Sequence, residues 1–457
     1  MSAGVALEVW GAADTVTGSR FLVTTPHSTT LVDCGLFQGL KVLRARNRVP
    51  FPVPPSTIDT VVLTHAHLDH SGYVPALVRD GYAGRVLCTP GTAALCGILL
   101  PDSGHLLEEE AATAGRGGWS RHAHPTPLYT VEDAERSLRH LQPIPFAGRH
   151  AVGDVELELT PAGHIVGAAH VTVRTRGVTV HFSGDLGRAD DPLMRPPSPP
   201  SDADVIVVES TYGDRTHPPQ DPAAQLADIV RRTVARRGVV LIPAFAVGRT
   251  ESLLLHLSRL RASGAIPEVP VYVNSPMAVN ATTIYRRHRE EHRISDEEFE
   301  AMYDLARLVT SVEGSKALNQ KDGPMVIISA SGMITGGRIL HHLKRFGPDP
   351  ANTVVLAGYQ AAGTRGAALA SGAPTVRIHG RDVPIRAEVA LLDSMSAHAD
   401  ADGLLAWLRS APRPPRQVLV THGEPSAADV LRARIEHELG WAARVPEHGE
   451  RIDVEPR

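Results

Sequence analysis

Hydrophobic positions in the first 200 residues form short runs separated by Gly, Pro and Ser, as in a β-rich domain. Residues 60–64 (TVVLT) form an uninterrupted apolar run, which is typical of a buried strand. Residues 155–160 alternate as VELELT, which is typical of a strand with one buried face. Further strands are predicted at 7–10, 20–24, 30–33, 171–175 and 178–182, the last two as a hairpin around an Arg-Gly turn, and helices at about 71–79 and 92–100.

From about Val205 the pattern changes to a longer alternation of strands and helices. This rhythm predicts a parallel α/β unit. Beyond it, strands return near Val383, and a helix, a strand and a last helix follow. The apolar runs of the α/β unit lie at 239–243, 271–273, 325–328 and 353–357, and the later helix and strand at about 401–408 and 418–421.

Length and composition limit the class of protein. A chain of 457 residues is too long for one ordinary core, so two domains are expected. Apolar residues make up 42% and charged residues 21%, which indicates a globular protein. The net charge of −4 excludes a globally basic nucleic-acid binder but leaves room for a local basic cleft. Aromatic residues, at 4%, offer few platforms for stacked bases.

The cysteines and the N-terminus indicate where the protein works. Cys34, Cys88 and Cys96 are too widely spaced for a disulfide framework or a cysteine zinc cluster, so we expect buried thiols in a reducing compartment. The N-terminus lacks a basic region followed by a long apolar stretch, and no segment reaches about 18 apolar residues. The sequence therefore predicts a cytoplasmic protein without a membrane partner.

Potential metal ligands follow three of the predicted strands. His65, His67, Asp69 and His70 come directly after the apolar run 60–64. In the turn after a strand, residues two apart can point to a common side, so His65 and His67 can serve one ion while Asp69 and His70 turn toward a second. Imidazole and carboxylate groups are the usual zinc ligands where cysteine is absent. The alternative, a solvated polar loop, fits four such residues in six positions poorly.

The other two features are weaker when taken singly. His164, in Gly163-His164, ends the VELELT strand and alone would more often be a structural histidine. Asp185, in Ser183-Gly184-Asp185, alone would be part of an ordinary turn, with Gly184 allowing close backbone approach. Because all three features lie at strand ends, together they predict one metal site at one edge of a β core.

At these residues the chain resembles the metallo-β-lactamase superfamily, which implies an αββα sandwich. The HxHxDH motif, the Gly-His phrase and the Ser-Gly-Asp phrase all match. The resemblance implies two Zn²⁺ per chain, the first held by His65, His67 and His164 and the second by Asp69 and His70, with Asp185 bridging. Asp33 matches an early aspartate that orients the site rather than binding metal.

The α/β segment resembles the β-CASP insertion of RNA- and DNA-processing nucleases, including the endonuclease of pre-mRNA 3′-end formation. Matching phrases occur in order along nearly the whole chain, at 208–213, 243–249, 274–277, 331–338, 358–360, 396–400 and 421–424. The resemblance implies a metallo-β-lactamase domain formed by residues 1–208 and 386–457, with a β-CASP domain at 209–385. It makes His398 the last ligand of the second zinc, and Glu209 the acidic residue that supports a catalytic histidine.

In one place the chain departs from the nuclease pattern. These nucleases often carry a histidine shortly after the phrase that corresponds to residues 358–360 here, and this histidine helps to protonate the leaving group. In this chain the position falls near Ala368. Two alternatives stay open. Another group, such as His422, takes the role, or water and metal serve the leaving oxygen.

The predicted reaction is hydrolysis of RNA phosphodiester bonds, with endonucleolytic cleavage favoured. Two zinc ions about 3.5–4 Å apart lower the pKa of a bridging water and hold the phosphoryl oxygens, and Asp69 is placed to orient the attacking hydroxide. Arg249 is suited to grip a phosphate through its planar fork. A loop of small residues could contact the substrate backbone through its own backbone N–H groups, with a plain tight turn as the alternative. The residues of this loop are Ser331, Gly332, Gly336 and Gly337.

We expect a single-stranded RNA substrate in a narrow channel, because basic patches and aromatic residues are few. Hydrolysis of DNA or of small phosphodiesters is a second reading, and a non-catalytic RNA-processing scaffold is a third. The oligomeric state stays open, with a homodimer among the alternatives.

Overall fold

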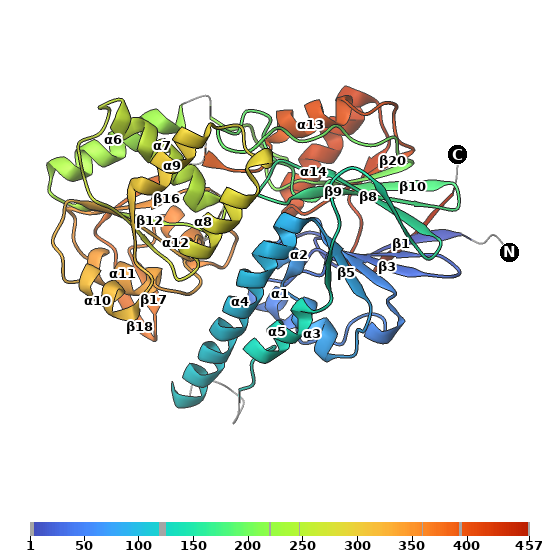
Figure 1. Cartoon of the computed structure of the whole chain (residues 1–457), viewed down its shortest axis with the longest axis horizontal. Helices are drawn as coiled ribbons and strands as arrows, with labels where there is room; N and C mark the ends of the chain where they lie inside the picture. Colours follow the sequence, from blue (N-terminus) through green and yellow to red (C-terminus); the bar gives the residue numbers. More distant parts are fainter. Residues whose placement is uncertain are drawn as a thin grey trace. The chain divides into compact units, whose positions relative to one another are not determined.

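The computed structural model (Figure 1) describes residues 4–117, 125–218, 221–245, 247–358, 360–392 and 395–455. Ala246 and Tyr359, which belong to two of the matching phrases, lie outside these ranges. The chain divides into two compact units. The first comprises Met1–Asp190, Arg195–Thr216 and His398–Arg457, and the second comprises Asp191–Met194 and His217–Ala397. The domain limits 209 and 385 stay a prediction.

The first unit contains two mixed sheets, each part antiparallel and part parallel. The first has the order β22-β1-β2-β3-β4-β5-β6 and the second the order β21-β20-β11-β10-β9-β8-β7. The strands of the first sheet are β1 (Val5–Val9), β2 (Phe21–Thr24), β3 (Thr29–Val32), β4 (Thr60–Val62), β5 (Arg85–Cys88), β6 (Leu141–Pro143) and β22 (Glu450–Val454). Those of the second are β7 (Arg149–Val152), β8 (Val155–Pro161), β9 (Ala169–Thr175), β10 (Val178–Phe182), β11 (Val205–Glu209), β20 (Gln417–Thr421) and β21 (Ala443–Arg444).

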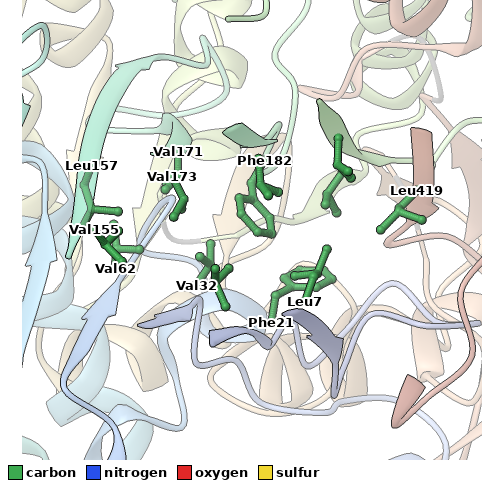
Figure 2. Packing of buried hydrophobic residues seen from close by; sticks show 14 of the residues in the cluster. Leu7, Phe21, Val32, Val62, Val155, Leu157, Val171, Val173, Phe182 and Leu419 are labelled. Carbon is green, nitrogen blue, oxygen red and sulfur yellow. The ribbon is translucent and has the colours of Figure 1, made fainter. Parts of the chain in front are cut away.

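The main core lies between these two sheets. Figure 2 shows Leu7 and Val62 of the first sheet and Leu157 and Phe182 of the second pointing into one apolar layer. The period of two in a strand explains how such a layer forms. In β8, for example, Leu157 and the other core-facing residues alternate with more exposed glutamates, as the VELELT pattern predicted.

Helices cover the outer faces of the sandwich, which gives the predicted αββα architecture (Figure 1). Ile206 and Val208 of β11 pack on the other side of the sheet, against leucines of the C-terminal helices such as Leu404. Because both faces of β11 are buried, its sequence VIVVE is nearly continuous in apolar residues. The helices of this unit are α1 (Lys41–Arg46), α2 (Leu68–Ser71), α3 (Val74–Arg79), α4 (Pro90–Gly117), α5 (Val131–Leu138), α13 (Ala401–Arg409) and α14 (Pro425–Arg434).

The second unit is built on an all-parallel sheet of order β14-β13-β15-β12-β16-β19, which confirms the predicted α/β rhythm. Its strands are β12 (Val239–Pro243), β13 (Val271–Asn274), β14 (Ala306–Leu308), β15 (Met325–Ser329), β16 (Thr353–Leu356) and β19 (Glu388–Leu391), and a separate hairpin is formed by β17 (Thr375–Ile378) and β18 (Arg381–Pro384). Its helices are α6 (Pro222–Ala235), α7 (Arg249–Ala262), α8 (Ala278–Arg287), α9 (Asp296–Asp304), α10 (Val312–Leu318), α11 (Ile339–Phe346) and α12 (Arg365–Ala370).

Several local predictions can be compared with the structure. The hairpin of β9 and β10 is confirmed, and its turn residues Arg176 and Gly177 both have positive φ. Cys34, Cys88 and Cys96 are buried free thiols. Among the described residues, no helix combines the length and the apolar character needed to span a membrane.

Candidate metal centre

The polar residues singled out from the sequence meet at one edge of the sandwich in the first unit. β3 and β4 are parallel neighbours, and so are β10, β11 and β20, so within each set the carboxyl ends lie together. Each of these strands is followed, at or just beyond its end, by a side chain of the site. These are Asp33 after β3, His65 after β4, Asp185 after β10, Glu209 in β11 and His422 after β20.

A first group consists of His65, His67, His164 and Asp185. His67 Nδ1 lies 3.1 Å from His65 Nε2 and 3.2 Å from His164 Nε2. Asp185 Oδ2 lies 3.4 Å from His65 Nε2 and 3.6 Å from His164 Nε2. Four potential ligand atoms therefore converge within 4.8 Å of one another. The structure brings together the residues that the resemblance assigned to the first zinc.

A second group consists of Asp69, His70 and His422. His70 Nε2 lies 3.0 Å from His422 Nε2, and His422 Nε2 lies 3.6 Å from Asp69 Oδ2. The other carboxylate oxygen of Asp185, Oδ1, lies 3.1 Å from His70 Nε2. Asp185 thus faces the first group with one oxygen and the second group with the other, which is the geometry a bridging carboxylate needs.

His398 and His422 occupy positions that differ from the sequence prediction. The prediction placed His398 with Asp69 and His70, but the structure brings His422 there. His398 instead donates through Nδ1 to Glu209 Oε1 at 2.9 Å, and its Nε2 lies 3.9 Å from Asp185 Oδ2. The reason is strand order, because β20 runs parallel to β11 and delivers His422 to the common edge. His398 is held by a bridge to Gly187.

Glu209 holds His398 in place. Its side chain is buried, and besides His398 it accepts hydrogen bonds from Leu186 N at 2.7 Å and Thr211 N at 3.2 Å. A buried carboxylate with three donors has its hydrogen-bonding capacity well satisfied. The predicted supporting role of Glu209 toward a histidine is therefore matched by its contacts.

Asp33 and Gly184 support the metal centre but are not among its candidate ligands. Asp33 Oδ2 accepts from His70 Nδ1 at 2.7 Å, while Oδ1 accepts from Thr64 N at 2.8 Å. This bond fixes the orientation of the His70 ring and leaves Nε2 for the second group. Gly184 has a φ of +56°, and a Cβ there would lie 2.8 Å from Thr64 Cβ, so the close approach expected at this glycine is present.

The protonation states of the first group suit a cation site. Burial and the neighbouring His65 lower the pKa of His67 to about 3, and burial together with His398 lowers the pKa of His164. For Asp185 burial acts in the opposite sense, but His70 and His422 more than offset it and hold the pKa well below its usual value. Neutral imidazoles and ionised carboxylates are the forms that bind metals.

The spacing of the ligand atoms also fits. Zinc with ligands at about 2.0–2.1 Å in tetrahedral geometry separates those ligands by about 3.3 Å. The distances of 3.1 to 3.6 Å in the first group bracket this value. The cluster of histidine and aspartate side chains is therefore compatible with a site for two metal ions.

The residues predicted to bind substrate lie in the second unit, at the carboxyl ends of its parallel strands. Arg249 begins α7 after β12, and a Cβ on Gly358 would lie 3.1 Å from Arg249 Nη2, so the guanidinium rests against the backbone after β16. Ser331 follows β15, and its Oγ accepts from Gly336 N at 3.3 Å, so this small-residue loop closes on itself as a tight turn. A Cβ on Gly332 would lie 2.9 Å from Phe245 N.

Sequence reasoning missed Phe245 as a feature of this edge. Its side chain is 38% exposed although it lies in an otherwise apolar phrase, 243–249. The signal was an aromatic residue directly after a buried strand. Near Ala368, in α12, the expected histidine is absent, as the sequence shows.

Fold and site together define a metal-dependent hydrolase of the metallo-β-lactamase superfamily. The model of that superfamily matches residues 14–237, the Beta-Casp domain model matches 250–369, and the model of a Zn-dependent metallo-hydrolase RNA specificity domain matches 382–446.

Within that superfamily the chain belongs to the β-CASP family. It is 39% identical over 425 residues to a ribonuclease of Thermus thermophilus, covering 91% of this chain and 92% of the relative. It is 31% identical over 449 residues to the transcription termination factor FttA of Methanosarcina mazei, covering 94% and 68%. A crystal structure of a protein of unknown function from Enterococcus faecalis shares the fold, with a TM-score of 0.52, 13% identity and coverage of 99% and 100%.

Proposed function

We propose that this protein is a ribonuclease that hydrolyses phosphodiester bonds of single-stranded RNA with two Zn²⁺ bound at the candidate metal centre. The observation that carries the proposal is the position of Asp185, whose two carboxylate oxygens face two separate ligand groups. The match to an RNA specificity domain and the name of the Thermus thermophilus relative support RNA as the substrate.

The ligands of the first ion would be His65, His67, His164 and Asp185, and those of the second Asp69, His70, His422 and Asp185. Two zinc ions bound in this way supply Lewis acidity and a water of lowered pKa. Besides its place in the second group, the carboxylate of Asp69 would orient the attacking water. Arg249 would grip a phosphate of the RNA strand in the second unit.

His398 is our candidate for protonating the leaving oxygen, in place of the histidine missing near Ala368. Burial opposes its protonation, but the charges of Glu209 and Asp185 more than offset this and raise the pKa of His398 to about 9. The Glu209 contact at Nδ1 leaves Nε2 directed to the centre, near Asp185. His422, which the sequence suggested for this role, lies with Asp69 and His70 instead.

The activity is tested with zinc-loaded protein and end-labelled single-stranded RNA and DNA of matched sequence. We expect cleavage of RNA, with product lengths that separate internal from terminal cutting, and no cleavage by His67→Ala. Equal cleavage by both proteins, or none by the wild type, would contradict the proposal. Preferential cleavage of DNA would favour a deoxyribonuclease, and a chain that binds RNA without cutting it would favour a scaffold.

Two further variants test the roles of the two histidines. His422→Ala should lose part of the bound zinc, whereas His398→Ala should keep it and lose about 10²–10⁴-fold in the rate of RNA cleavage, as expected for a general acid. A phosphodiester with a p-nitrophenolate leaving group needs no protonation, so His398→Ala should cleave it nearly as well as the wild type. An equal loss on both substrates would refute the proton-donor role.

A further inference from the structure

Helix α1 and its flanks, residues 40–49, concentrate positive charge in a chain whose net charge is −4. The segment reads LKVLRARNRV and contains no aspartate or glutamate. Its cations are Lys41, Arg44, Arg46 and Arg48. The helix itself has no fully buried residue: Leu43 and Arg46 are partly covered, and its other residues are exposed.

Among the described residues these cations form no ion pair, but Arg46 lies over the Phe37 ring at 5.5 Å and Arg48 donates to Thr126 O at 2.7 Å. Lys41 and Arg44 are exposed and are the cations left open to a partner. Helix α6 and its C-cap provide the contrast, because arginines are also concentrated at its end. There Arg232 pairs with Asp228 and Glu388, and Arg236 pairs with Glu388 at 2.7 Å. Arg232 and Arg236 are thus neutralised within the fold, whereas Lys41 and Arg44 of α1 are left for a partner.

Apolar side chains on the same segment are also exposed. Val42 is 67% exposed, Val49 59% and Leu40 44%. The segment is nevertheless held near its C-terminal end: Arg20 Nη2 donates to Asn47 Oδ1 at 3.3 Å, and the Asn47 side chain exchanges two hydrogen bonds with the backbone of Phe37. A rigid, cationic and partly apolar element of this kind suits docking better than packing.

The residues just before the segment pair with the metal-binding loop in the same unit. Leu36 N donates to Leu68 O at 2.8 Å, and Cys34 N donates to His70 O at 2.7 Å. Lys41 is five positions after Leu36, so their Cα atoms are at most about 18 Å apart. A polyanion bound at the metal centre needs only a short further stretch to reach α1.

We infer that α1 is a second contact surface for the RNA substrate, holding the phosphate backbone of the strand beyond the scissile bond. The inference rests on the proposed ribonuclease function and extends it from the centre to the surrounding surface. The unpaired cations would neutralise phosphates without reading sequence. Val42 and Val49 would pack against sugars or bases. The occupant we commit to is the RNA substrate itself, because it is a polyanion that would already be bound at the metal centre of the same unit.

The test compares two charge-matched double variants. One is Lys41→Gln with Arg44→Gln. The control is Arg85→Gln with Arg176→Gln, two exposed arginines of the same unit that lie at the strand ends opposite the metal centre. Binding of a long single-stranded RNA is followed by fluorescence anisotropy against salt concentration, in a His67→Ala background that prevents cleavage. Zinc content and the far-UV spectrum of each double variant report folding.

We expect the α1 variant to bind the long RNA roughly tenfold more weakly, with a log–log salt slope reduced by about 1.4 for two lost phosphate contacts, and the control to bind normally. With His67 intact, the α1 variant should raise KM for the long RNA and leave kcat unchanged, and cleavage of a trinucleotide should not change. Equal binding by the α1 variant and the control would overturn the inference.

The outcomes separate this inference from the proposed function. If the wild type cleaves RNA but both double variants bind alike, α1 is not an RNA surface although the function stands. If the wild type cleaves nothing and only the α1 variant loses RNA binding, the surface stands and the ribonuclease proposal fails. Failure of the His67→Ala protein to bind long RNA would overturn the inference, as would an α1 variant that changes only the sedimentation of the protein.

Discussion

Buried imidazoles in this protein lie in two different settings. At the metal centre, ring nitrogens of His65, His67 and His164 face one another. In the second unit, His342 faces amides instead: its Nδ1 donates to Asn319 Oδ1 at 2.7 Å, and its Nε2 accepts from Asn274 Nδ2 at 2.7 Å. Because no second proton fits between His342 and Asn274, this histidine is held neutral in one tautomer.

The neutral form of His342 predicts acid sensitivity of the second unit. Burial, His341 and Arg338 lower the pKa of His342 to about 4, whereas in the unfolded chain a histidine titrates near 6.5. Since the unfolded state binds the extra proton between these values, the stabilisation is complete above about pH 6.5 and is lost as the pH falls toward 4. Between about pH 7.5 and 5 the loss should be about 2 kcal/mol, measured by hydrogen exchange in β13 and α11.

Two variants serve as comparisons for this experiment. His342→Gln should be less stable than the wild type at neutral pH but should lose less stability on acidification. His437→Gln, at an exposed position, should follow the wild type. The explanation would be refuted if His342→Gln and the wild type lost stability in parallel.

The two histidines His398 and His422 mark where residue-level prediction reached its limit. His65, His67 and Asp185 could be placed from the sequence, because each directly follows an apolar strand and the turn fixes its direction. His398 and His422 both follow strand-like segments in the last part of the chain. Which of them joins Asp69 depends on β20 pairing with β11, a contact between strands about 200 positions apart in sequence that no local pattern specifies.

At the scale of elements, the strands were the features most predictable from the sequence, whether they bury one face or both. The alternation of β8 required a core on one side, and Leu157 and Leu159 are completely buried there. Helix ends were less predictable. Helix α4 was expected to stop near Leu100, but it continues through Pro101 to Gly117. A proline removes one backbone hydrogen bond and favours a stop, yet packing of α4 against α5 and β6 sustains the helix.

Strand β8 links the core to the metal centre, because it ends at Pro161, shortly before His164. Leu159→Ala would leave a cavity between the two sheets, and we expect a loss of about 2–5 kcal/mol in the free energy of unfolding of the first unit. Denaturant unfolding, with zinc content measured in parallel, checks this. Val430→Ala, at a position 42% exposed on α14, should change stability by less than about 0.5 kcal/mol. Similar losses in the two variants would argue against the inter-sheet core as the main source of stability.

At the scale of the whole molecule, the two units differ in what they need to stay folded. The first unit gathers three buried carboxylates, Asp33, Asp185 and Glu209, beside histidines whose lone pairs face one another. The second unit has an ordinary apolar core on both faces of a parallel sheet. The chain length predicted two domains, whereas the change of pattern near Val205 falls at β11, which still belongs to the first unit.

Removal of metal should therefore loosen the first unit and spare the second. A ligand that binds only the folded state stabilises it by about 4 kcal/mol at a thousandfold excess over its dissociation constant, and this is lost when a chelator strips the ions. Repulsion among the buried carboxylates would add to the loss. We expect hydrogen exchange to accelerate at the ends of β4 and β10, next to His65 and Asp185, while β12 and β15 keep their protection.

Re-addition of zinc should restore the protection, and His67→Ala should show part of the loss before any chelator is added. Equal acceleration in both units would mean that the cluster does not depend on cations for its stability, and that its close-packed nitrogens are satisfied by protons alone.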